Sequence, residues 1–114
     1  WIEGNHDPGP VGLGGAHLSE FHSGTLLFRH IAETAGHGEI SGHYHPKLTL
    51  NLKGRALTRR CFIYDQKRLI MPAYGTYTGG LSVQSEPLGS MLDRDAICIL
   101  TGSKAMPVPR SKQR

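Results

Sequence analysis

The chain has 114 residues, with 13 Lys and Arg against 9 Asp and Glu, so its formal net charge is +4. This length is usual for one domain, and a hydrophobic fraction of 38% is enough for a core. The sequence has no run of about 18 apolar residues, so we expect no membrane-spanning helix in it. Cys61 and Cys98 are far apart and form no C-x-x-C motif, so we expect buried, reduced thiols of a cytoplasmic protein.

Glycine and proline divide the sequence into short segments, most of which read as strands. Residues 1–15 are an apolar stub followed by a turn-rich loop, residues 16–24 are a strand or one short helix, and residues 24–33 are a strand. Another strand begins near Glu39, and the leucines at 48, 50 and 52 alternate with polar residues, a period of two. Residues 57–65 and 68–74 predict a hairpin, residues 86–93 a short helix and residues 95–102 an apolar strand. We therefore expect a mostly β structure over residues 1–106, followed by a basic, disordered tail at 107–114.

Two histidines near the middle of the chain raise the first functional hypothesis. His43 and His45 flank Tyr44 between a glycine and Pro46. In an extended strand, residues i and i+2 point to the same face, so both imidazoles would lie side by side where they suit a transition metal. The alternative is that both are half-exposed strand residues beside a turn.

A second polar cluster follows the apolar stub at the start of the chain. Asn5, His6 and Asp7 stand at an expected junction between strand and loop. An Asn oxygen can bind a hard cation, and a His beside an Asp can be a proton donor with an orienting carboxylate. These residue types also favour turns, so an ordinary corner at Asp7-Pro8 is the alternative.

The ordered set of these motifs resembles a known family. Gly-Asn-His-Asp at 4–7, His30 after an apolar strand and Gly-His-Tyr-His at 42–45 resemble the later motifs of the calcineurin-like metallophosphoesterase superfamily. The stretch PAYGTYTGGL at 72–81 is similar to its ligase-associated DNA-damage-response phosphoesterase branch, an endonuclease group. The resemblance implies an α/β protein with a four-layer αββα fold when intact, of which residues 1–106 form the mostly β C-terminal portion.

The resemblance also implies a chemistry and a role for each residue. The family members are hydrolases that cleave phosphodiester or phosphomonoester bonds with two divalent metal ions, here manganese before iron or zinc. By the family pattern the second metal is bound by Asn5, His30 and His43, the first by His45, while His6 protonates the leaving oxygen or steadies the transition state and Asp7 orients it. Paired metals of this kind bind the phosphate oxygens and offset their negative charge.

Two earlier family motifs, D-x-H and G-D-x-x-[DN], have no counterpart in this sequence. Only residues 1–4 precede Asn5, so ligands for the first metal and a bridging Asp are absent. We therefore expect a fragment whose site is completed by an N-terminal half or by a partner chain, with oligomer formation as one route. Alone it would have little or no activity and would expose an apolar sheet face.

Two other classes of function stay open at this point. The chain could be a non-catalytic nucleic-acid-binding module that uses Arg55, Arg59, Arg60 and the basic tail on phosphates. It could also be a structural metal-binding piece of a larger assembly. The exact substrate is open in each case, because a fold does not dictate its function.

Overall fold

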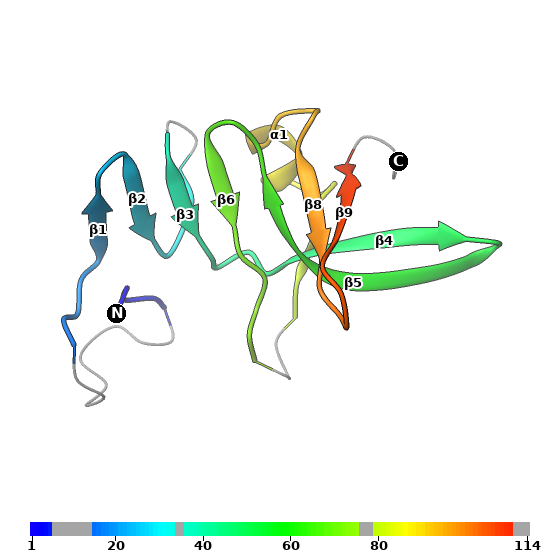
Figure 1. Ribbon diagram of the computed structural model, residues 1–114, viewed down its shortest axis with the longest axis horizontal. Coiled ribbons are helices and arrows are strands. Elements are labelled where there is room, and N and C mark those ends of the chain that lie inside the picture. Colours follow the sequence, from blue (N-terminus) through cyan, green and yellow to red (C-terminus); the bar gives the residue numbers. More distant parts are fainter. Residues whose placement is uncertain (6–14, 34–35, 76–78, 111–114) are drawn as a thin grey trace.

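A computed structural model describes residues 1–5, 15–33, 36–75 and 79–110, and in these ranges the chain is mostly β, as expected (Figure 1). In chain order the elements are β1 (Glu20–Ser23), β2 (Leu26–Arg29), β3 (Glu39–Ser41), β4 (Pro46–Leu52), β5 (Arg55–Tyr64), β6 (Arg68–Ile70), β7 (Leu81–Ser82), α1 (Leu88–Met91), β8 (Ile97–Leu100) and β9 (Met106–Pro109). The strands join in one mixed arrangement with the order β1-β2-β3-β6-β5-β4-β7, and β8 and β9 extend it from β5.

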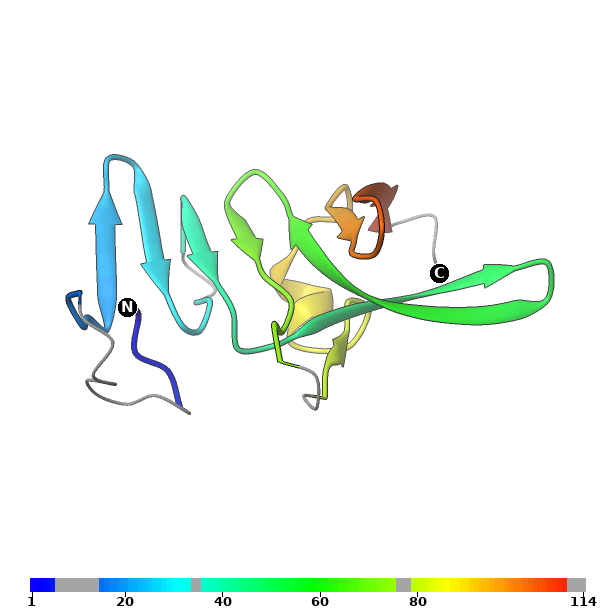
Figure 2. The same ribbon diagram turned by 60° about the horizontal axis from the view of Figure 1, so that its bottom comes forward.

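The long strand β5 belongs to two sheets. Its first half pairs antiparallel with β4, from Arg55 opposite Leu52 to Arg60 opposite Lys47. Its second half lies between β6 and β8, where Ile63 pairs with both Ile70 and Cys98. The first half of β5 and its partner β4 therefore extend away from the rest of the molecule as a two-stranded hairpin (Figures 1 and 2).

On the other side of β6, parallel pairing places the carboxyl ends of β2, β3 and β6 at one edge of the sheet. β2 runs parallel to β3, with Leu27 opposite Glu39, and β3 runs parallel to β6, with Glu39 opposite Arg68. Parallel neighbours have their carboxyl ends at one edge of the sheet. The segments that follow β2 and β3 therefore begin side by side.

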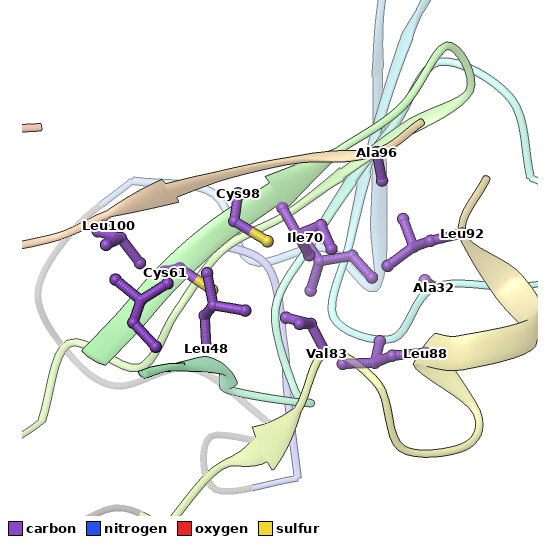
Figure 3. Packing of buried hydrophobic residues seen from close by; sticks show 12 residues of the cluster. Ala32, Leu48, Cys61, Ile70, Val83, Leu88, Leu92, Ala96, Cys98 and Leu100 are labelled. Carbon is purple, nitrogen blue, oxygen red and sulfur yellow. The ribbon is translucent and has the colours of Figure 1, made fainter. Parts of the chain in front are cut away.

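The hydrophobic core lies where the two sheets and α1 meet (Figure 3). Its buried members are Ala32, Leu48, Leu50, Cys61, Ile63, Ile70, Val83, Leu88, Leu92, Ala96, Cys98 and Leu100. Both cysteines are fully buried and free, as the sequence predicted. The shared hydrogen bond with Cys98, together with burial, raises the pKa of the Cys61 thiol, so this group stays protonated.

The hairpin from Asp65, the short helix and the final apolar strand are confirmed by β5–β6, α1 and β8. The tail boundary at 107 needs correction, because β9 pairs with β8 as far as Pro109. Arg110 is also buried, and its guanidinium donates to the carbonyl oxygens of Leu92 and Gly89 at 3.0 and 2.8 Å. Residues 107–110 are thus ordered by strand pairing and buried hydrogen bonds, and residues 111–114 lie outside the described ranges.

Apolar side chains are exposed beside the first two strands, in agreement with the expected open sheet face. Trp1, Leu18 and Phe21 are each more than two-fifths exposed. With Phe28 they line a cavity of about 410 Å³. Among the described residues, no helix is long and apolar enough to cross a membrane.

Candidate metal centre

Three side chains from separate parts of the chain meet at the carboxyl edge of β2 and β3. His30 Nε2 lies 2.7 Å from Asn5 Oδ1 and 3.0 Å from His43 Nδ1. The two imidazole rings have centroids 4.9 Å apart and are inclined by 75°. The sequence named these three residues as ligands of one ion, and the fold brings them together.

Strand pairing explains why the two histidines meet although 13 positions separate them. His30 directly follows β2, and His43 follows β3 by two residues, while the two strands are parallel neighbours. The pairing continues past the strand ends, because the amide of Gly42 donates to the carbonyl of His30 at 2.9 Å. The backbone pairing therefore holds the two histidines close together without the help of a metal ion.

Asn5 reaches the same place through the first residues of the chain. Ile2 forms a parallel bridge with Leu18, and the amide of Glu3 donates to the carbonyl of Leu18 at 2.8 Å. Gly4 then passes directly beneath the ring of His30, where an added Cβ would lie 2.7 Å from Nδ1. Any side chain at position 4 would push against this imidazole, so glycine is needed for the close approach.

The turn that carries His43 differs from the strand that the sequence suggested. β3 ends at Ser41 and β4 begins at Pro46, so the two imidazoles do not share a strand face. His43 has a φ of 65°, and the amide of Tyr44 donates to the carbonyl of Gly42, which together make a γ-turn. The left-handed conformation thus falls on His43 and again on His45, with φ 52°, rather than on Gly42. Each such residue costs about 1–3 kcal/mol, and this kind of strain gathers at functional sites.

The backbone of His45, two positions after His43, is held by a hydrogen bond from the start of β7. Its carbonyl accepts a hydrogen bond from the amide of Leu81 at 3.1 Å, where β7 approaches the start of β4. Gly80 permits this approach, since an added Cβ would lie 2.6 Å from the same carbonyl oxygen. Gly80 therefore allows the 72–81 stretch to approach the backbone of His45 closely.

A buried ion network supports the segment that follows His30. Glu39, whose side chain is 0% exposed, accepts a hydrogen bond from Arg29 Nε at 2.6 Å and lies 3.8 Å from Arg68 Nε. The same carboxylate accepts from the amide of Glu33 at 3.0 Å, and Gly36 packs closely against it. Sequence reasoning missed this network, although charged residues inside short apolar strands are a signal for it.

The trio has donor atoms at a spacing that is compatible with one metal ion. Neighbouring ligands at about 2.1 Å from an octahedral metal lie roughly 3 Å from one another, and the two separations within the trio, 2.7 and 3.0 Å, are close to this. Within the described ranges no group of three His, Cys, Asp or Glu side chains forms a metal cluster. The predicted catalytic residues His6 and Asp7 lie outside the described residues.

Comparison with solved structures places this fold among known ones. The nuclease MPE of Pseudomonas putida is similar to this chain with a TM-score of 0.68 and 25% sequence identity. The match covers 94% of this chain and 52% of that chain, so this chain spans about half the length of that nuclease. No protein-family model and no curated protein matches the chain. The fold of this chain is thus similar to that of about half of a nuclease.

Proposed function

We propose that this chain contributes the second-metal half of a dinuclear metallophosphoesterase site and belongs to a nuclease. The proposal rests on one observation: Asn5 Oδ1 and His43 Nδ1 both lie within 3.0 Å of His30 Nε2. The likeness to a nuclease supports the same class of reaction. The strained turn at His43 supports it as well, because a turn alone would be more stable with Gly or Asn there.

One ion would be held by Asn5 Oδ1, His30 Nε2 and His43 Nδ1, and His45 would serve a second. Mixed nitrogen and oxygen donors suit manganese, iron or zinc, and we propose manganese first. The pair of ions, when bound, would supply a hydroxide nucleophile and charge compensation for a phosphoester. His6 would deliver a proton to the leaving oxygen, with Asp7 orienting its ring.

The trio leaves the first ion with His45 alone, so further ligands must come from outside the described residues. We propose that an N-terminal half or a partner chain supplies them, across the exposed apolar surface around Trp1, Leu18 and Phe21. The full reaction therefore belongs to the completed site. The substrate that we propose is a phosphodiester in nucleic acid, in the setting of DNA repair.

Metal titration of this chain by calorimetry tests the proposal directly. We expect one Mn²⁺ or Zn²⁺ site whose affinity falls at least tenfold in His43→Ala, because one of three ligands is lost. His22→Ala is the matched control, since His22 is exposed in β1 and pairs with Leu27 of β2, three positions before His30. Equal metal affinity of His43→Ala and the native chain would overturn the proposal, as would the absence of metal binding.

A hydrolysis assay gives a second, independent measurement. With bis-(p-nitrophenyl) phosphate and Mn²⁺, we expect this chain alone to show little or no turnover, because the first ion lacks its other ligands. Full turnover by this chain would contradict the expected division of the site, although not the metal binding of the trio.

A further inference from the structure

The hairpin of β4 and β5 has a shape that the core does not explain. Beyond Lys47 on β4 and before Arg60 on β5, neither strand pairs with a third strand among the described residues. The two strands form an arm whose base contributes Leu48 and Leu50 to the core and whose outer part, residues 51–59, is exposed throughout. The arm extends along the longest dimension of the molecule, which is 47 Å against 30 and 25 Å in the other directions (Figure 2). Five residues on each strand, 48–52 and 55–59, give an arm of roughly 17 Å.

The charge of this arm has a single sign. Five cations, Lys47, Lys53, Arg55, Arg59 and Arg60, occupy residues 46–64, and no Asp or Glu occurs between Glu39 and Asp65. Lys53, Arg55 and Arg59 are exposed, whereas Lys47 and Arg60 are half-buried at the base. In a chain of net charge +4, the arm therefore carries the positive excess.

One face of the arm combines these cations with apolar side chains. Cross-strand partners share a face, and the pairs Leu48–Arg59, Leu50–Leu57 and Leu52–Arg55 lie on the same one. Leu50 is buried in the core, but Leu52 and Leu57 are 53% and 36% exposed near the tip. An exposed surface of arginine and leucine fits a partner that presents regular negative charges beside less polar sugars and bases.

The base of the arm adjoins the candidate metal centre. Pro46, the first residue of β4, follows His45 directly, and His43 lies only three positions before it. Arg60 at the base donates to the carbonyl of Ala73 at 3.3 Å, which ties the arm to the 72–81 stretch. A polyanion that leaves the centre along the arm would meet cations from the base to the tip.

We propose that the β4–β5 arm is a binding surface for the phosphate backbone of a nucleic acid and holds a polynucleotide substrate on one side of the metal centre. The inference rests on the proposed function for the identity of the substrate, but the binding itself requires no metal. Arg110 of the expected basic tail takes no part, because it is buried under α1. The arm itself presents three exposed cations, Lys53, Arg55 and Arg59.

The test measures oligonucleotide binding by the full chain in the presence of a chelator, with fluorescence anisotropy as the readout. A labelled single strand of about 20 nucleotides is titrated between about 50 and 200 mM salt with the native chain and with R55Q/R59Q. Glutamine keeps a stem over Leu52 and Leu57 while removing charge. K67Q/R94Q is the matched control, because it removes two exposed cations that lie in the β5–β6 turn and beside α1.

Loss of two phosphate contacts lowers the slope of log affinity against log salt by about 1.5 and weakens binding roughly 30-fold at 0.1 M salt. We expect this for R55Q/R59Q and less than a twofold change for K67Q/R94Q. Equal affinity and slope in R55Q/R59Q and the native chain would overturn the proposal. Equal losses in both double variants would also overturn it, because binding would then follow net charge rather than the arm.

Two further outcomes separate this inference from the proposed function. If the trio binds metal but nucleic-acid binding does not depend on the arm, the proposed function stands and the inference is refuted. Arm-dependent nucleic-acid binding without any metal site would keep the arm as an interface and refute the phosphoesterase. Concentration-dependent dimers that R55Q/R59Q abolishes, with unchanged nucleic-acid binding, would assign the arm to self-association and also overturn the inference.

Discussion

Replacing Glu39 with glutamine should destabilise the protein far more than the same change at an exposed partner of the same arginine. Glu39 is fully buried between Arg29, at 2.6 Å, and Arg68, at 3.8 Å. Glutamine keeps the shape of the side chain but removes its charge. Two guanidinium groups, whose side chains are 12% and 1% exposed, would then face a neutral amide.

The expected loss follows from these distances. A pair of opposite charges near 4 Å is worth about 4 kcal/mol at an effective dielectric constant of 20. Glutamine also avoids the cost of burying a charged carboxylate, which offsets part of this loss. Loss of one member of a buried pair typically costs about 3–5 kcal/mol. We therefore expect a fall of about 3 kcal/mol in the free energy of unfolding, a large share of the 5–15 kcal/mol usual for a domain.

Urea unfolding followed by circular dichroism measures this loss. With a slope of about 1.5–2 kcal/mol per molar urea, the midpoint of Glu39→Gln should fall by about 1.5–2 M. Glu20→Gln is the matched control, because Glu20 also contacts Arg29, at 3.1 Å, but is 45% exposed and should lose less than about 1 kcal/mol. Equal losses in the two variants would refute the reasoning that burial makes the Glu39 pair important.

Three substitutions and one labelling experiment test the site and the core further. Gly4→Ala should reduce metal affinity by about tenfold in calorimetry, because its Cβ displaces the ring of His30; unchanged affinity would contradict this contact. Leu48→Ala should lower the free energy of unfolding in urea by about 2–5 kcal/mol, since Leu48 is 1% exposed. Leu52→Ala, at a position 53% exposed, should change that free energy by less than about 0.5 kcal/mol, and similar losses in both would refute the assigned core. The Cys61 thiol, whose pKa is raised by its hydrogen bond to a second thiol and by burial, should resist a thiol reagent at neutral pH until urea unfolds the chain; rapid native labelling would argue against its burial.

Local patterns predicted the local structure well. The hairpin at Asp65 follows from residue type, because its Oδ1 accepts hydrogen bonds from the amides of Lys67 and Arg68 at 2.8 and 3.0 Å. The period of two in β4 likewise anticipated a strand with Leu48 and Leu50 inside. Both features depend on neighbours within a few positions of the sequence.

Features that depend on pairing between distant segments could not be predicted from the sequence. The strands β2, β3 and β6 have three or four residues each, too few to reveal that they run parallel. Burial of Glu39 follows only from that parallel register, which places Arg68 beside it. The motifs named Asn5, His30 and His43 as a group, and the fold places these three side chains together, while their role as ligands stays a prediction. The strand geometry offered to explain the pair at 43 and 45 was wrong, because a period of two gives no sign of left-handed residues.

Because β5 is divided between two sheets, the outer part of the arm can change in evolution without a change in the core. The inner half, Cys61–Tyr64, is locked in register by neighbours on both sides, so the outer half inherits its alignment without help from the tip. Inserting one residue into each strand beside the Lys53-Gly54 turn would keep the pairing aligned, leave every core contact in place and lengthen the arm by about 3 Å. Descendants of this chain could thus adjust their reach along a partner as freely as they adjust a surface loop.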